Sequence, residues 1–134
     1  MLIFLDTETT GLEATDKICS IAVVYEEDAE LKSIYELVNE GKKIPPLASS
    51  INHITNEMLK GCPKLHDTKA YQFLQTYNDI NTTIVGHNIN FDLKMLEASG
   101  FRFYGSVVDT LRATRHLIKE CEFFSLQFLR YELK

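Results

Sequence analysis

The chain begins with a short apolar run that leads directly into two acidic residues. The run, Met1-Leu2-Ile3-Phe4-Leu5, is too short to cross a membrane and is typical of a buried strand. Asp6 and Glu8 follow, and because they are two residues apart their side chains share one face of an extended chain. Two adjacent carboxylates repel each other unless a cation lies between them. We therefore expect Asp6 and Glu8 to bind a divalent cation with oxygen ligands, Mg²⁺ or Mn²⁺.

The residues after the acids favour a site over a simple turn. A lone pair of acids at this spacing would more often be a solvated turn at the end of a strand. Here the continuation is Thr9-Thr10-Gly11-Leu12, in which Gly11 permits a turn or a close approach of the backbone to a ligand. A strand of this kind with this continuation makes the functional interpretation the stronger one.

Composition and charge fit one soluble globular domain of 134 residues. The net charge of −5 argues against a protein that coats nucleic acid, but not against an enzyme whose acids bind metal ions. The three cysteines are far apart and form no Cys-x-x-Cys pair, so we expect no zinc site or disulfide framework and a reducing cytoplasm. No basic region precedes the apolar run, and no apolar run reaches 18 residues. We expect neither a secretory signal nor a membrane segment.

Hydrophobic periodicity predicts five strands and five helices. The predicted strands cover residues 1–5, 18–25, 31–38, 83–87 and 107–110, and the second and third form a hairpin across a polar turn. The predicted helices begin at Thr55, Asp67, Asn88 or Asn90, Thr110 and Ser125, and residues 41–50 are predicted to form a loop. This order predicts an α/β fold, a mixed five-stranded sheet flanked by helices. We expect nine residues to be buried: Ile3, Leu5, Ile21, Val23, Ile84, Val85, Phe91, Leu96 and Leu117.

A third acid, Asp92, follows the fourth predicted strand. It lies in the first turn of a predicted helix, where an acid on its own is most simply a helix-dipole or capping residue. If the first and fourth strands are neighbours, however, Asp92 reaches the end of the sheet that carries Asp6 and Glu8. Three carboxylates in one place suit a two-metal site for attack on a phosphodiester. We expect them to lie close enough to share one cation.

Three motifs together give the chain a family resemblance. Asp-Thr-Glu-Thr-Thr-Gly-Leu from Asp6, His-Asn-Ile-Asn-Phe-Asp from His87 and Val-Val-Asp-Thr-Leu-Arg-Ala-Thr-Arg from Val107 resemble the DEDD (DnaQ-like) 3′–5′ exonucleases. Within that family the resemblance is greatest to the proofreading (epsilon) subunits of bacterial DNA polymerase III. It covers nearly the whole chain in the family's order, including residues 52–59 and 125–133. It implies an RNase H-like fold and a two-metal 3′–5′ exonuclease that releases nucleoside 5′-monophosphates from the 3′ end of single-stranded DNA.

The resemblance also implies roles for individual residues. Asp6, Glu8 and Asp92 match three of the family's four metal-binding acids. The implied substrate-binding residues are Thr7, Thr9, Thr10, Gly11, Leu12, His53, Ile54 and Phe91. Among these, His53 and Ile54 are expected near the terminal base and sugar, and Phe91 beside the phosphate. Asp109 and His87 are expected to have structural or supporting roles.

One motif of the family does not occur in this sequence. The family's third motif, His-x-x-x-x-Asp or Tyr-x-x-x-Asp, supplies a general base and a fourth acid shortly after the helix predicted from Ser125, and residues 126–134 lack it. We therefore expect residues 1–134 to be an exonuclease domain without its C-terminal helix, weakly active or inactive alone. An uncovered last helix would also favour a homodimer.

Other functions remain open from the sequence. A non-catalytic module on the same fold, binding nucleic acid or protein, would also retain these strands and helices. An RNA-trimming exonuclease would use the same acids, and no residue here recognisably binds the 2′-hydroxyl group. Association with polymerase subunits follows only from the resemblance.

Overall fold

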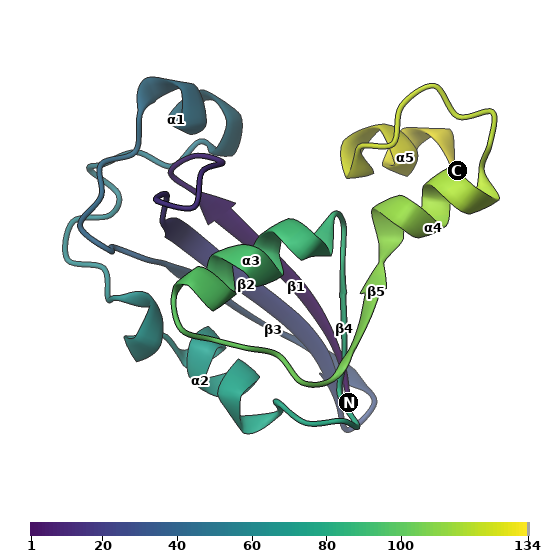
Figure 1. Ribbon diagram of the computed structural model, residues 1–134, viewed down its shortest axis with the longest axis horizontal. Coiled ribbons are helices and arrows are strands. Elements are labelled where there is room, and N and C mark those ends of the chain that lie inside the picture. The colour runs from purple at the N-terminus through teal and green to yellow at the C-terminus, as the bar shows by residue number, and fades with distance from the viewer. Residues whose placement is uncertain (134) are drawn as a thin grey trace.

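A five-stranded mixed sheet forms the centre of the computed structural model, which describes residues 1–133. The strands are β1 (Leu2–Thr9), β2 (Ile18–Glu27), β3 (Glu30–Leu37), β4 (Thr83–Gly86) and β5 (Ser106–Asp109). Their order in the sheet is β3-β2-β1-β4-β5, so β1 is the central strand (Figure 1). β1 pairs antiparallel with β2 and parallel with β4, as the predicted hairpin and crossovers require. The predicted fold class is confirmed.

Helices flank this sheet. They are α1 (Pro46–Asn52), the 3₁₀ turn η1 (Leu65–Asp67), α2 (Lys69–Thr76), α3 (Ile89–Ala98), α4 (Thr110–Leu117) and α5 (Leu126–Glu132). The helix predicted from Thr55 is wrong, because residues 56–61 form turns. A helix forms earlier instead, at α1, where a loop was predicted. Pro46 occupies its first turn, a position that tolerates proline because no helical N–H partner is lost there. No helix within residues 1–133 is long and apolar enough to cross a membrane.

The main core lies on one face of the sheet, under α2 and α3. Ile3 and Leu5 of β1 pack there with Leu74 of α2 and Leu96 of α3. The alternate residues Leu2 and Phe4 are 48% and 44% exposed. The apolar run is therefore buried on one face only, and the prediction of a fully buried strand is wrong. A run of apolar residues does not show which face of a strand is covered.

Most of the predicted core residues are buried, with two differences. Ile3, Leu5, Ile21, Val23, Ile84, Val85 and Leu96 are at most 8% exposed. Phe91 is only partly buried against the core. Leu117 is 77% exposed, which contradicts the prediction. It is the last residue of α4, a helix without a buried residue, and Figure 1 shows α4 and α5 set apart from the body of the sheet.

Candidate active site

The carboxyl end of β1 extends beyond its neighbour β4. The pairing of β1 with β4 stops at Phe4 and Val85, and β4 itself ends at Gly86. The N–H group of Thr7 consequently has no strand partner on that side. Oδ1 of Asp92, in the first turn of α3, accepts hydrogen bonds from the Thr7 N–H at 2.9 Å and from the Thr7 hydroxyl at 2.6 Å. Asp92 thus takes the place of a strand partner for the N–H group of Thr7.

Asp6 and Glu8 point to the other face of the sheet from Thr7. Thr7 is 7% exposed on the side that α3 covers, whereas Asp6 is exposed and Glu8 half-buried. Asp92 therefore reaches the tip of β1 from the helical side, and the other two acids lie on the opposite side. The strand edge at Thr7 is where the three acids approach one another.

The electrostatics show that these acids influence each other. Burial raises the pKa of Glu8, and the charges of Asp6 and Asp92 raise it further. Burial raises the pKa of Asp92 to about 6, against the opposing effect of its hydrogen bonds from Thr7, and the charge of Asp6 adds to the rise. Burial also raises the pKa of Asp6, while the nearby His87 lowers it. At neutral pH the site holds mutually repelling negative charge that a cation would offset.

The carboxylates of Asp6, Glu8 and Asp92 are chemically suitable ligands for a hard divalent cation. Carboxylate oxygens are the ligands that Mg²⁺ and Mn²⁺ prefer, and three of them carry unfavourable charge here. The side-chain positions do not meet the expectation that the three acids lie close enough to share one cation. Within residues 1–133, no three His, Cys, Asp or Glu side chains are gathered closely enough to hold one metal ion. Oδ1 of Asp92 is instead engaged with Thr7.

A cavity of about 410 Å³ lies beside the tip of β1 and has a volume in the range of small-molecule sites. Six of the predicted substrate-binding residues line it: Thr7, Thr9, Thr10, Gly11, Leu12 and Phe91. Glu8 lines it as well, so the cavity adjoins one of the three acids. The structure thus brings the first motif and the start of α3 together around one space.

The opposite wall of the cavity comes from α1, which the sequence analysis missed. Leu47 and Ile51 line the cavity and are 75% and 70% exposed. Large apolar side chains left exposed next to a cavity are typical of a binding surface. Their spacing of four residues after Pro46 was a signal for a short helix with one apolar face. Asn52, at the end of α1, donates a hydrogen bond to the carbonyl of Thr9 at 3.3 Å and so ties this wall to β1.

His53 and Ile54 do not line the cavity. His53 ends α1 with a left-handed backbone, at φ 61°. Ile54 is 3% exposed and packs with Cys19, Ile44 and Leu59 in a second apolar cluster. The side chain of Ile54 therefore packs in the protein interior next to the wall of the cavity and not at the surface of the cavity.

A hydrogen-bonded turn holds the far end of the first motif. The carboxylate of Asp16 accepts hydrogen bonds from the hydroxyl of Thr10 at 3.0 Å and the N–H of Glu13 at 2.9 Å, and pairs with Lys42 at 2.7 Å. A Cβ atom at Gly11 would lie 2.7 Å from the Cγ of Asp16. Gly11 is needed here because the backbone lies against this carboxylate. The backbone at Gly11 thus closely approaches a side chain of the same protein. Its approach to a ligand stays a prediction.

Asp109 and His87 support neighbouring elements, as predicted. Oδ1 of Asp109 accepts hydrogen bonds from the N–H groups of Leu111 at 2.9 Å and Asn88 at 3.0 Å, so it caps α4 and also holds the start of α3. Asp109 takes the capping position that was predicted for Thr110. His87 donates from Nε2 to the carbonyl of Phe124 at 2.6 Å, since a carbonyl can only accept, and so ties the segment between α4 and α5 to β4.

The hydroxyl of Thr7 is expected to position Asp92. Thr7→Val keeps the shape of the side chain and the N–H hydrogen bond but removes the hydroxyl donor. We expect any catalysis that depends on Asp92 to slow about tenfold and the protein to lose about 1 kcal/mol of stability, the usual contribution of one hydrogen bond. Steady-state rates and thermal unfolding measure both effects. Thr7→Ser is the control because it retains the donor, and equal losses in both variants would contradict a role for the hydroxyl.

The chain is similar to a known protein family, to curated relatives and to solved structures. The model of the RNase_T family, described as "Exonuclease", matches residues 3–134. The DNA polymerase III subunit epsilon of Treponema pallidum is 37% identical over 100 residues, which are 69% of this chain and 43% of the relative. The PolC-type DNA polymerase III of Lacticaseibacillus paracasei is 29% identical over 98% of this chain and 9% of the relative. The chain thus spans less than half the length of either relative.

Solved structures show the same arrangement of elements. Exonuclease X in complex with 5′ overhanging duplex DNA has a TM-score of 0.77 and 28% identity, over 99% of this chain and 73% of that chain. E. coli Exonuclease I in complex with an oligonucleotide has a TM-score of 0.73 and 19% identity, over 96% of this chain and 35% of that chain. The second similarity concerns the fold alone.

Proposed function

Because the chain belongs to the RNase_T exonuclease family, we propose that it is a metal-dependent exonuclease domain that removes nucleoside 5′-monophosphates from the 3′ end of single-stranded DNA. The observation that carries the proposal is the junction at Thr7. There, an apolar-walled cavity adjoins Glu8, and Asp92 binds the open edge of the strand that presents Asp6. The cavity therefore adjoins Glu8 at the end of the central strand, on which Asp6 lies and to which Asp92 is hydrogen-bonded.

The cavity suits the last nucleotide of a strand. Leu47 and Ile51 of α1 and Phe91 of α3 offer apolar surfaces on which a base or sugar can pack. Such contacts are indifferent to base identity, since every base has an apolar face. The backbone from Thr9 to Leu12 closes the cavity at its β1 side. A nucleotide held there would have its phosphate near Glu8, at the acidic end of the cavity.

We propose that Asp6, Glu8 and Asp92 hold Mg²⁺ or Mn²⁺. When bound, such cations lower the pKa of water and stabilise the leaving oxygen of a phosphodiester. The protein's part is to orient the three acids. Thr7 orients Asp92, and its two hydrogen bonds also favour the charged carboxylate. Burial opposes that charge, so the acids are poised to bind a cation as soon as one is available.

We infer the substrate, DNA, and the partner, a polymerase, from the relatives. The curated relatives are DNA polymerase III proteins, and the solved structures named above contain DNA. Whole relatives extend well beyond the matched segment. We propose that this domain edits 3′ ends made by a polymerase, or acts as a free-standing relative of such editing domains.

The test is the release of mononucleotides from a 16-residue strand with a 3′-terminal label, in Mn²⁺ and in EDTA. We expect labelled 5′-monophosphate as the first product in Mn²⁺ and none in EDTA. DNA and RNA strands of one sequence distinguish the proposed substrate from RNA trimming. A strand blocked by a 3′-phosphate is the control for polarity. Because residues 126–134 lack the family's third motif, we expect the release to be slow. A protein that binds the strand but releases no nucleotide in Mg²⁺ or Mn²⁺, even when it is extended by a segment that supplies that motif, would contradict the proposal and favour a non-catalytic module.

A further inference from the structure

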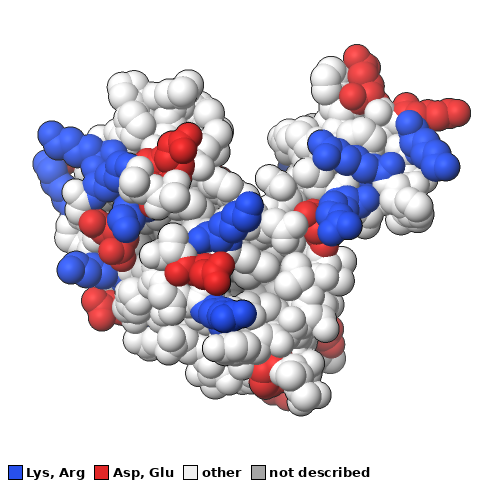
Figure 2. Space-filling view, in the orientation of Figure 1, with Lys and Arg blue, Asp and Glu red and all other residues white. Residues whose placement is uncertain are grey.

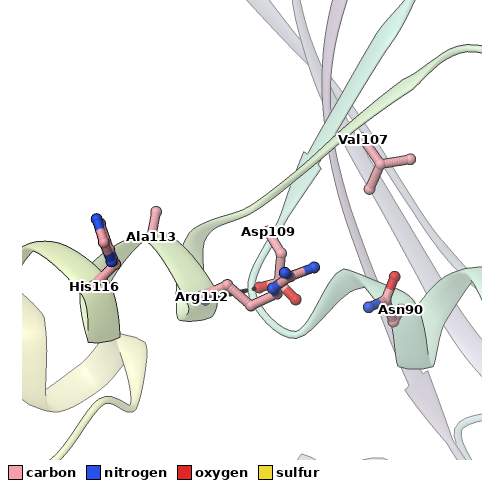
Figure 3. Close-up of a pocket in the computed structure, with 6 residues that line it drawn as sticks. All are labelled: Asn90, Val107, Asp109, Arg112, Ala113 and His116. Atoms are coloured by element: carbon pink, nitrogen blue, oxygen red, sulfur yellow. Dashed lines mark hydrogen bonds between the residues drawn. The ribbon is translucent and has the colours of Figure 1, made fainter.

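Two adjoining cavities form a groove along the outer side of α3. One, of about 540 Å³, lies between α3, β5 and α4, and the other, of about 320 Å³, lies between α3 and the segment leading into β5. Asn90 and Val107 line both cavities, so the two are continuous there. Figure 3 shows Arg112 extending from α4 towards Asn90 of α3 across the first of them. We refer to this combined space as the α3–α4 groove.

The α3–α4 groove is lined by more cationic than anionic side chains, in a chain with a net charge of −5. Lys94 and Arg102 line one end, and Arg112 lines the other. All three side chains are exposed. Figure 2 shows Lys and Arg side chains over α3 and over α4 on this face. The groove is therefore a locally basic surface on an acidic protein.

These positive charges are not neutralised within residues 1–133. No ion pair there includes Lys94, Arg102 or Arg112. Two acids, Glu97 and Asp109, line the groove. The carboxylate of Asp109, however, already accepts N–H groups at the start of α4, where the helix dipole offsets its charge. The three cationic side chains Lys94, Arg102 and Arg112 outnumber the two acids, so the lining keeps a net positive charge.

The position of the groove links it to the candidate active site. Asn90 and Phe91 are consecutive residues in the first turn of α3, and they face different spaces. Phe91 lines the cavity beside Glu8, whereas Asn90 lines the α3–α4 groove. A chain of phosphates that leaves the cavity past the start of α3 would enter the groove next.

We infer that the α3–α4 groove binds the phosphate backbone of the single-stranded DNA whose 3′ end occupies the cavity. This inference rests on the proposed function, since it assigns the upstream part of the same strand. Lys94, Arg102 and Arg112 contact phosphates, and Asn90 donates an amide hydrogen bond where the strand passes from one space to the other. Such contacts carry no base specificity, as the removal of successive nucleotides requires.

The test measures binding separately from cleavage. The anisotropy of a 5′-fluorescein-labelled 16-residue oligothymidylate, in EDTA at 0.05 M salt, gives the dissociation constant of the whole strand. The double variant Lys94→Gln/Arg112→Gln is expected to weaken binding by roughly tenfold or more. The slope of log K against log salt should fall by about 1.4, or 0.7 for each lost contact with a single strand. Competition by a thymidine dinucleotide, which is too short to reach the groove, should be unchanged.

The matched control is Lys32→Gln/Lys60→Gln, which removes the same charge from lysines that already pair with Glu27 and Glu57. The inference is overturned if the groove variant binds the long strand as tightly as the control variant does. Release of nucleotide in Mn²⁺ is measured on the same proteins. A chain that binds through the groove but does not cleave, even when extended by a segment that supplies the third motif, would refute the exonuclease proposal and leave the groove assignment standing.

Discussion

Asp6→Asn is expected to reduce exonuclease activity by at least about a thousandfold while the protein remains folded. The change removes a proposed metal ligand. When several groups act as one catalytic unit, the removal of one of them lowers the rate by far more than an equal fraction of the total effect. Burial raises the pKa of Asp6, so its charge is unfavourable in the metal-free fold, and its loss should not lower stability. The measurement is mononucleotide release in Mn²⁺, with thermal unfolding of the same samples.

Asp28→Asn is the matched control for this prediction. It makes the same chemical change in the exposed turn between β2 and β3, where the positive φ of 54° suits asparagine. We expect its activity to equal that of the unaltered chain. If Asp6→Asn instead lowered the melting temperature enough to unfold the protein at the assay temperature, Asp6 would be structural and the loss of activity would say nothing about catalysis.

Asp92→Asn is expected to stabilise the metal-free protein at pH 8. The folded-state pKa of Asp92 is raised to about 6 from 3.8, so the folded protein binds this proton more tightly than the unfolded chain does. The resulting stability is present below pH ~4 and is lost as the pH rises through about 6. A shift of about two units corresponds to ~3 kcal/mol. Asparagine carries no charge and can still accept both hydrogen bonds from Thr7, so it avoids that cost.

Thermal unfolding in EDTA at pH 4 and pH 8 checks this prediction. At pH 8 the variant should be more stable by ~1–3 kcal/mol, whereas at pH 4 the two proteins should unfold together. Mn²⁺ should then stabilise the unaltered protein and have little effect on the variant, because a ligand that binds only the folded state raises its stability. A variant that is less stable than the unaltered chain at pH 8 would show that the charge of Asp92 contributes favourably to the fold.

The sequence was sufficient for the sheet because strand signals are local. Hairpin residues on either side of the turn at residues 28–29 pair as predicted, and β1 is central. Which face of β1 is covered depends on the packing of α2 and α3, which no pattern within the strand contains. For that reason the burial of Ile3 was predicted correctly, and the exposure of Phe4 was not. Leu117 was missed for a similar reason, since α4 buries none of its residues.

The roles of the predicted site residues stay predictions, whereas their arrangement differs in part from the expectation. The motifs identified Asp6 and Asp92, and the turn after β1 lines a cavity as expected. The hydrogen bonds from Thr7 to Asp92 depend on where β4 ends relative to β1, a matter of strand register. The wall formed by α1 depends on a seven-residue helix whose signal was weak. Ile54 was expected at the substrate, but it packs in the second apolar cluster.

Asp6, Glu8 and Asp92 are proposed to bind a divalent cation together. Calorimetric titration of Mn²⁺ into the protein at pH 8, with thymidine 5′-monophosphate present, tests this proposal directly. We expect saturable binding to the unaltered chain and to Asp28→Asn, and binding weakened tenfold or more in Asp6→Asn and in Asp92→Asn. Equal Mn²⁺ affinity in all four proteins would contradict the claim, because the acids at the tip of β1 would then have no part in holding the metal.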